Sequence, residues 1–301
     1  MDFSFTDEQQ ELRDSARSWL AERYPPERVA ELAESEAGWD PESWSQLAEL
    51  GWLGVSVPEE HGGAGLGFLE EAILLEELGY ALYPGPYLAT VALALPALDA
   101  DEQAQVAAGR ARWSVEVGGL VPDWGRVDRV VGGPAVGEAV PSIDPTRPLG
   151  RMPPRGGALG SRALAALACE AVGVAQRALE WGIEHARTRE QFGKPIGVYQ
   201  AVSHSLADSY VEIELARSLA YWAAWAVAEG DEQAGLASAA AKAQATEAAV
   251  SACERSIQVH GGIGFTWEHP LHRWYKRALW LEAFGGRPAD HRAAVAAALL
   301  G

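Results

Sequence analysis

The stretch RTREQFGKPIGVYQ, residues 187–200, separates two long segments of helical pattern. Apolar side chains recur every three or four residues on both sides of it, at Leu164, Leu167, Ala171, Val174 and Ala178 and again at Val202, Leu206, Tyr210 and Ile213. This spacing predicts two amphipathic α-helices. Similar patterns predict a third helix over residues 233–259 and shorter helices over 271–284 and 289–300. Long alanine-rich helices joined by short loops predict an antiparallel helical bundle.

The N-terminal part of the chain also has a helical pattern. Thr6 followed three residues later by Gln9 suits a capping box, and the prolines at 25 and 26 end the helix that this box begins. A second helix is predicted over residues 41–50, with Gly51 just past its C-terminus. Glycine-rich residues 54–67 are predicted to form a loop, followed by helix over 69–78 and again up to residue 95 after a Pro-Gly-Pro break.

Residues 110–160 have a different character. Alternation and β-branched content predict short strands over residues 113–117 and 127–131, and glycine and proline interrupt the rest. This segment is long enough for a small sheet but too short for a full sandwich or barrel. We therefore expect a mainly α protein with an N-terminal helical domain over residues 1–109, a shortened middle β-region over 110–160 and a C-terminal bundle over 161–301.

The composition excludes several classes of protein. A 48% hydrophobic share with 22% charged residues is typical of a globular protein, and the formal charge of −18 disfavours nucleic-acid binding. No apolar run is long enough to span a membrane, and the acidic start Met1-Asp2 lacks the basic region of a signal peptide. The two cysteines, Cys169 and Cys253, exclude a disulfide framework or a cysteine zinc site. These features predict a cytoplasmic protein.

The common catalytic motifs are missing from this sequence. There is no G-x-S-x-G elbow, P-loop or H-E-x-x-H motif, and the glycines at 261, 262 and 264 follow a helix rather than a strand, which argues against a Rossmann unit. The spacing of His260, His269 and His272 matches no common zinc pattern, so we interpret them as loop or capping histidines.

Two segments of the C-terminal zone combine residues that suit a pyrophosphate. One is residues 187–200, and the other is residues 258–265, at the C-terminal end of a predicted helix. Arginine side chains and backbone N–H groups freed by glycine bind phosphate oxygens well. The alternative is purely structural, namely a helix–helix turn and a glycine C-cap.

Four segments in one order, residues 5–12, 50–63, 189–200 and 258–265, resemble the acyl-CoA dehydrogenase family of flavoenzymes. The resemblance covers about four fifths of the chain and both of its ends. It implies a helical N-terminal domain, a middle β-domain and a C-terminal four-helix bundle. It also implies FAD and the α,β-dehydrogenation of an acyl-CoA thioester, in which a glutamate removes the α proton and the β hydrogen leaves as hydride to the flavin.

The resemblance also assigns candidate cofactor contacts. By the family pattern, the FAD pyrophosphate and adenosine are contacted across a subunit interface by Arg189, Gln191 and the adjacent Phe192, and further contacts come from Gln200, Gln258, Gly261 and Gly262.

The chain departs from the family pattern at the chemical centre. Residues 110–160 lack the family's loop and strand that hold the flavin ring, and only residues 142–147 resemble the exit of a truncated middle domain. The usual position of the catalytic glutamate is Gly285, and the alternative position early in the bundle is Ala163. The resemblance therefore implies the short, degenerate subunit of an α2β2 heterotetramer, as in bacterial sterol side-chain catabolism. A full-length subunit would supply the base, and an electron-transfer flavoprotein would accept the electrons.

Two alternatives remain open at the level of sequence. A self-sufficient enzyme could use a displaced base, Glu282 or Glu170, although both are typical of solvated or salt-bridged helix carboxylates. A flavin-free scaffold subunit is the other alternative. We interpret Trp222 and Trp225 as packing or interface residues, and the loop at 62–67 either borders a ligand cleft or is a plain connector.

Overall fold

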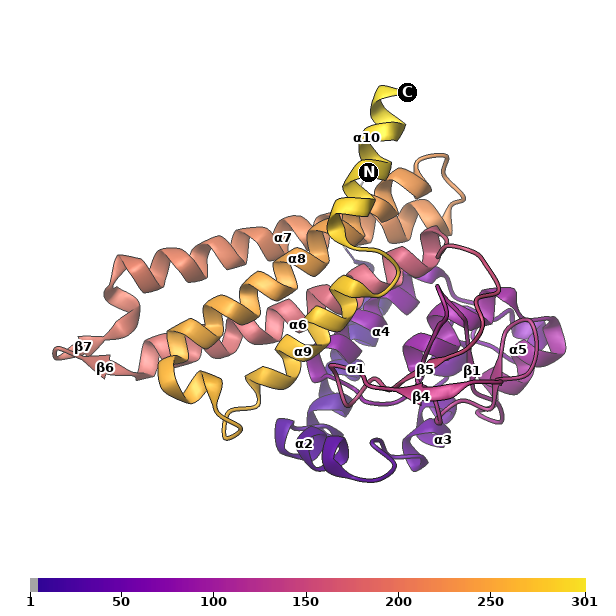
Figure 1. The fold of residues 1–301 in the computed structure, drawn as a ribbon, viewed down its shortest axis with the longest axis horizontal. Helices are drawn as coiled ribbons and strands as arrows, with labels where there is room; N and C mark the ends of the chain where they lie inside the picture. Colours follow the sequence, from indigo (N-terminus) through magenta and orange to yellow (C-terminus); the bar gives the residue numbers. More distant parts are fainter. Residues whose placement is uncertain (1–4) are drawn as a thin grey trace.

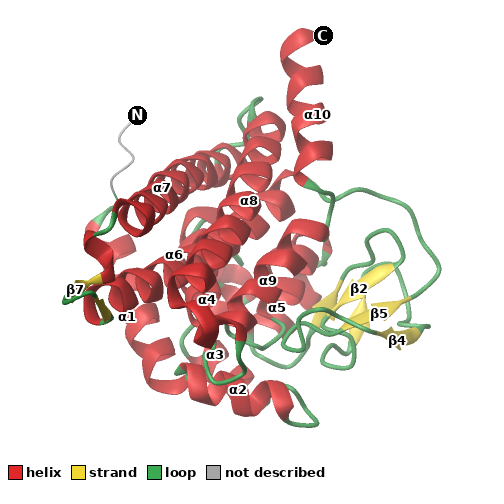
Figure 2. Ribbon diagram, turned by 60° about the vertical axis from the view of Figure 1, so that its left-hand side comes forward, coloured by secondary structure: helices red, strands yellow, loops and turns green. Residues whose placement is uncertain are grey.

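The computed structural model describes residues 5–301, and long helices dominate it (Figure 1). The helices α6 (Ser161–Thr188), α7 (Gln200–Ala228) and α8 (Ala234–His260) pack side by side, and α9 (Leu271–Ala283) lies against α6 and α8. The last helix, α10 (Pro288–Leu300), contacts α8 and projects from the bundle in both ribbon views (Figure 2). The prediction of a mainly α protein with a C-terminal helical bundle is confirmed.

The N-terminal domain is a set of shorter helices. It contains α1 (Asp7–Arg23), α2 (Pro26–Glu34), α3 (Glu42–Glu49), α4 (Phe68–Ala81) and α5 (Ala100–Ala107), together with the short 3₁₀ turns η1 (Trp52–Gly54), η2 (Glu59–His61) and η4 (Leu95–Ala97) and the π-helix η3 (Leu88–Ala94). The predicted capping box is present, because Thr6 accepts a bond from the Gln9 N–H and Gln9 accepts one from the Thr6 N–H. Pro25 and Pro26 end α1 as predicted, but Pro26 is also the first residue of α2, which we did not predict.

The middle region has shorter strands than predicted but more of them (Figure 2). It contains a parallel pair, β1 (Trp113–Ser114) with β3 (Arg129–Val130), and an antiparallel sheet in the order β2 (Leu120–Pro122), β5 (Leu149–Arg151), β4 (Glu138–Val140). The strand predicted over 113–117 stops after two residues because Val117 pairs with Leu120 around a tight glycine turn. The strand predicted over 127–131 is likewise reduced to two residues, so the segment forms a small sheet but no barrel.

Close helix contact holds the N-terminal domain to the bundle. A Cβ atom at Gly173 of α6 would overlap the backbone carbonyl oxygen of Glu76 on α4, and a Cβ at Gly79 of α4 would overlap that of Glu170 on α6. Only glycine at these two positions lets α4 and α6 approach so closely.

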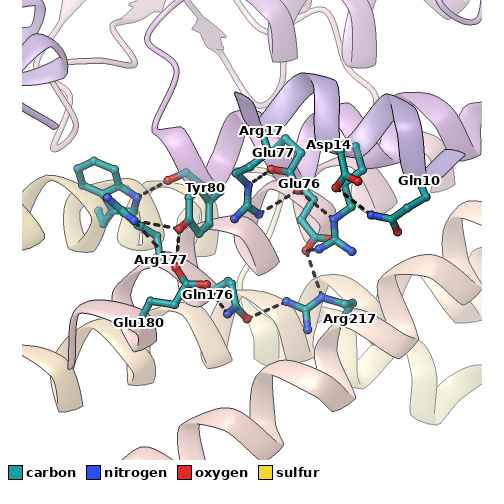
Figure 3. Close-up of polar contacts among 12 residues, drawn as sticks. Gln10, Asp14, Arg17, Glu76, Glu77, Tyr80, Gln176, Arg177, Glu180 and Arg217 are labelled. Carbon is teal, nitrogen blue, oxygen red and sulfur yellow. Dashed lines mark hydrogen bonds and ion pairs between the residues drawn. The ribbon is translucent and has the colours of Figure 1, made fainter. Parts of the chain in front are cut away.

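Buried charges reinforce the same contact, as Figure 3 shows. The carboxylates of Glu76 and Glu77 on α4 are fully buried, and arginines from α1 and α7 donate to them. The Arg217 guanidinium of α7 also donates to Gln176 of α6, at 2.9 Å, so one network joins four helices. Breaking such a pair would leave a buried charge unpaired, which is costly.

No helix in the described part of the chain is long and apolar enough to cross a membrane. Cys169 and Cys253 are both buried as free thiols in α6 and α8.

Candidate functional site

The segment 187–200 forms the tip of the bundle between α6 and α7. Its centre is a two-stranded hairpin, β6 (Glu190–Gln191) with β7 (Lys194–Pro195), followed by the 3₁₀ turn η5 (Ile196–Val198). Phe192 and Gly193 make the turn with positive φ values of 55° and 73°, as a two-residue hairpin turn requires. The Phe192 side chain is 91% exposed, so no residue that the structure describes covers it.

The polar side chains assigned to FAD are exposed at this tip. Arg189, Gln200 and Gln258 are all exposed, and their side chains form no hydrogen bond or ion pair with any other residue in the range 5–301. Gln191 donates only to the neighbouring Glu190 carbonyl, at 2.9 Å. These amides and this guanidinium are therefore available to a ligand.

The glycine pair lies at the C-terminal end of α8. Gly261 has a φ of 64° and begins the 3₁₀ turn η6 (Gly261–Phe265), and no other atom lies within 4 Å of where a Cβ of Gly261 or Gly262 would be. No side chain covers this turn, so it leaves room for a ligand.

A side-chain contact brings the two motifs to the same end of the bundle. The rings of His185, near the end of α6, and His260, at the end of α8, stack with their centroids 4.3 Å apart. Arg189 follows the first histidine by four residues and Gly261 directly follows the second. In Figure 1 the β6–β7 hairpin and the turn after α8 lie at the same end of the molecule.

These residues fit the phosphate and adenine end of FAD. A free guanidinium, free amides and an open glycine turn are the groups that bind a pyrophosphate. The middle region, with strands of two or three residues, supplies no extended sheet against which a flavin ring could lie.

The structure places no carboxylate at either expected position of the base. Gly285 has a φ of 76°, and a Cβ there would overlap Leu159 Cδ1 and lie 3.6 Å from Leu167 Cδ1. A glutamate at this position would therefore be strained and would meet leucine side chains. Ala163 is buried on α6 and contributes only a methyl group.

Glu170 belongs to a buried ionic cluster rather than to an open pocket. Its carboxylate is 2% exposed, and Arg147 Nη2 donates to it at 2.7 Å while Arg277 forms a second ion pair. Arg277 also pairs with Asp144. Burial alone would raise the pKa of the Asp144 carboxyl, but the Arg277 guanidinium holds this pKa below its ordinary value. Glu170 is therefore enclosed by protein and out of reach of a substrate.

The structure also places the other residues whose role the sequence left open. Glu282 is half-buried on α9, and its charge acts on the buried ammonium of Lys242. Trp222 and Trp225 pack, half-buried, against the core. The loop at 62–67 folds back on residues 54–57 through backbone hydrogen bonds from Ala64, Gly65 and Leu66, as a connector does.

Sequence reasoning missed Lys242 and the buried cluster around Arg277. Lys242 Nζ is fully buried and donates to the carbonyls of Leu281, at 2.7 Å, and Gly286, at 3.3 Å, so it fixes the turn that contains Gly285. Burial lowers the pKa of Lys242 to about 8. One sequence feature could have revealed the burial of Lys242: it lies four residues from both Ser238 and Thr246, which are buried on the same face of α8. The partners of Arg277 lie more than 100 residues away in sequence, so no local pattern reveals them.

Comparison with known proteins agrees with this architecture. The profile of the acyl-CoA dehydrogenase N-terminal domain matches residues 6–104, and that of the acyl-CoA dehydrogenase C-terminal domain matches residues 161–300. Acyl-CoA dehydrogenase IpdE2 of Mycobacterium tuberculosis is 35% identical, over 90% of this chain and 91% of that protein. FadE27 of the same organism is 30% identical, over 97% of both chains.

Solved structures have the same fold. One chain of the ChsE4–ChsE5 complex from Mycobacterium tuberculosis superposes with a TM-score of 0.87 at 27% identity, covering 99% of both chains. A variant of the Tcur3481–Tcur3483 steroid ACAD superposes with a TM-score of 0.85 at 27% identity, covering 97% of this chain and 98% of that one. The chain therefore belongs to the acyl-CoA dehydrogenase family.

Proposed function

We propose that this chain is the short subunit of a heteromeric FAD-dependent acyl-CoA dehydrogenase. It contributes contacts to FAD but does not carry the catalytic base. The observation that carries the proposal is the contrast between the free polar groups at the tip of the bundle and the leucine-filled surroundings of Gly285.

In this reaction class the acyl-CoA loses its α proton to a carboxylate and its β hydrogen as hydride to the flavin, which supplies the oxidising capacity when bound. The tip of this chain binds and orients the pyrophosphate and adenosine through the Arg189 guanidinium, and the open turn at Gly261 leaves room for them. Gln191, Phe192, Gln200, Gln258 and Gly262 make the further contacts. The glutamate that removes the α proton comes from a full-length partner subunit, and an electron-transfer flavoprotein is the electron acceptor.

Exposed apolar side chains at the tip and in the middle of α7 support a protein partner. Phe192 is 91% exposed, and Phe265 and Trp267 of the η6 turn are 74% and 72% exposed. On α7, Tyr210, Val211 and Leu215 are each more than half exposed. Large apolar groups that gather around a polar site are typical of a protein interface.

The relatives support a heteromer and a steroid substrate. The two solved relatives named above are each named as a pair of proteins, and one pair is named a steroid ACAD. We therefore propose an α2β2 heterotetramer that acts on a steroid-type acyl-CoA.

Removal of the Arg189 side chain tests the FAD contact. In the assembled complex, Arg189→Ala should lower the FAD retained after gel filtration by about tenfold or more, because a charge-assisted bond to phosphate is lost. Arg187→Ala, two residues earlier and also exposed, is the matched control and should retain FAD. Unchanged FAD content in Arg189→Ala would support a flavin-free scaffold, which has no need of that side chain.

A further inference from the structure

The end of α8 carries a cluster of three imidazole rings that the proposed function does not use. His260 lies between two others: its ring centroid is 4.3 Å from that of His185 on α6 and 4.2 Å from that of His269, just before α9. We call these three residues the histidine stack. Residues 261–268, which contain η6 and with it Gly261 and Gly262, connect His260 to His269, so this segment is held by the stack at both ends.

Hydrogen bonds fix which ring nitrogens carry protons. His260 Nδ1 donates to the Ser256 carbonyl, at 2.7 Å, since a carbonyl can only accept. His269 Nδ1 accepts from the Leu271 N–H, at 3.2 Å, at the first residue of α9, and it can accept only while that nitrogen is unprotonated. Ser256 Oγ also donates to the Ala178 carbonyl, at 2.6 Å, which ties α8 to α6. The observed hydrogen bond from Leu271 therefore requires a neutral His269 ring.

The charges around the stack do not favour protonation. Arg177 and Glu184 of α6, Glu27 of α2 and the three rings line one surface pocket, Arg189 lies close to His185, and His272 of α9 acts on His269. None of the salt bridges in the described residues involves a member of the stack. Burial and the neighbouring His260 lower the pKa of His269 to about 4 and also lower the pKa of His185.

We propose that the histidine stack positions the Gly261–Gly262 turn for FAD, and that protonation of His185 and His269 in acid releases the turn. A proton on His269 Nδ1 removes the acceptor of the Leu271 N–H, and a second proton on His185 places like charges on the two rings that flank His260. Both changes act where the segment 261–268 is held at its two ends. The inference rests on the proposed function only in assigning FAD to this turn. The opening of the turn itself does not depend on it.

Two substitutions at one position separate ring stacking from charge. His185→Phe keeps an aromatic ring beside His260 and removes one titrating group, whereas His185→Arg places a permanent charge there. His204→Phe and His204→Arg are the matched controls, because His204 is exposed on α7 and lies outside the stack.

Amide hydrogen exchange of the full chain without FAD measures the turn directly. The reporters are the Gly261, Thr266 and Leu271 amides, which donate to Gln258, Ile263 and His269. From about pH 7.5 to about pH 5, their protection should fall by at least about tenfold after correction for intrinsic exchange. His185→Phe should weaken this acid response, and His185→Arg should lower protection already at neutral pH. An unchanged acid response in His185→Phe, or no response in the unmodified chain, would overturn the proposal.

FAD affinity of the assembled complex over the same pH range provides the second readout. It should fall in acid in parallel with the protection, and His185→Phe should keep FAD to lower pH than the His204→Phe control. A turn that opens while FAD affinity stays constant refutes the positioning role and, with it, the contact of Gly261 with FAD. A turn that stays closed refutes this inference alone, because the Arg189→Ala test of the proposed function is independent of it.

Discussion

Gly285 stands where the family resemblance leads us to expect the catalytic glutamate. Its φ of 76° is easily adopted by glycine, and Leu159 occupies the space into which a side chain at 285 would project. Restoring a carboxylate therefore requires more than one substitution, since the surrounding packing has no room for it.

We expect Gly285→Glu to yield no acyl-CoA oxidation by this chain alone and to lower the free energy of unfolding by about 1–3 kcal/mol, from backbone strain and overlap with Leu159. Urea denaturation and a dye-reduction assay measure the two effects. Gly230→Glu is the control for backbone strain alone. Gly230 has a φ of 64°, but no other atom lies within 4 Å of where its Cβ would be. Turnover by the isolated Gly285→Glu chain would show that the position still faces a working site.

Arg277 is the residue on which the buried ionic cluster depends. It pairs with Asp144 and Glu170 and also donates to Thr146 Oγ1, at 2.7 Å. Arg277→Met leaves two buried carboxylates short of a partner and should lower the free energy of unfolding by about 3–5 kcal/mol. Arg292→Met, which breaks an exposed pair with Glu247, should cost only about 0–1 kcal/mol. Equal losses in the two variants, measured by denaturant titration, would contradict the assignment.

At the scale of elements, the end of α9 is held by a lysine from α8. Lys242 Nζ donates to carbonyls at the end of α9 and in the following turn, groups that a helix C-terminus leaves without partners. This bond sets the path of the chain through Gly285 and Gly286.

Lys242 should make stability depend on pH in the alkaline range. Its pKa of about 8 in the folded protein lies below the ordinary 10.5, so the unfolded chain binds more protons between these values and stability rises with pH there. From about pH 7.5 to about pH 9.5 the contribution of Lys242 to the free energy of unfolding should increase by about 2 kcal/mol. Urea midpoints of Lys242→Met should lack this rise, whereas those of the exposed control Lys194→Met should keep it. The same rise in both variants would rule out Lys242 as its source.

The helices were predictable from sequence because their apolar spacing is local. The capping box at Thr6 and the starts of α8, α9 and α10 lie within one residue of the predicted positions. α2 was missed because Pro26 was interpreted as a stop, although proline is also favoured at the first turn of a helix. The lengths of the two predicted strands were overestimated because β-branched residues favour extended structure, but the glycine turn at 118–119 closes the first strand early. The three strands of the antiparallel sheet, β2, β4 and β5, were not predicted.

The candidate site was predictable only in part. Exposed motif residues such as Arg189 and Gly261 could be picked out because the family resemblance marks them individually. The stacking of His185 on His260 and the filling of the Gly285 site by Leu159 depend on contacts between distant segments. Sequence spacing carries no information about such contacts until the fold brings the elements together.

At the scale of the whole molecule, one end of the bundle is polar and partly apolar, and no residue in the range 5–301 covers it. Exposed aromatic side chains and the polar groups that we propose to bind FAD gather there, while the small middle region leaves a flavin ring without an extended sheet. A partner subunit would cover the apolar side chains and complete the FAD site in the same step. On this account, assembly and cofactor binding are one event.

The central claim is that this chain binds FAD only together with a partner subunit, and equilibrium dialysis against FAD, followed by an acyl-CoA oxidation assay, tests it most directly. The samples are this chain alone, a full-length acyl-CoA dehydrogenase partner alone, and their equimolar mixture. The account predicts stoichiometric FAD and acyl-CoA oxidation in the mixture and neither in this chain alone. Stoichiometric FAD binding together with acyl-CoA oxidation by the isolated chain would contradict it.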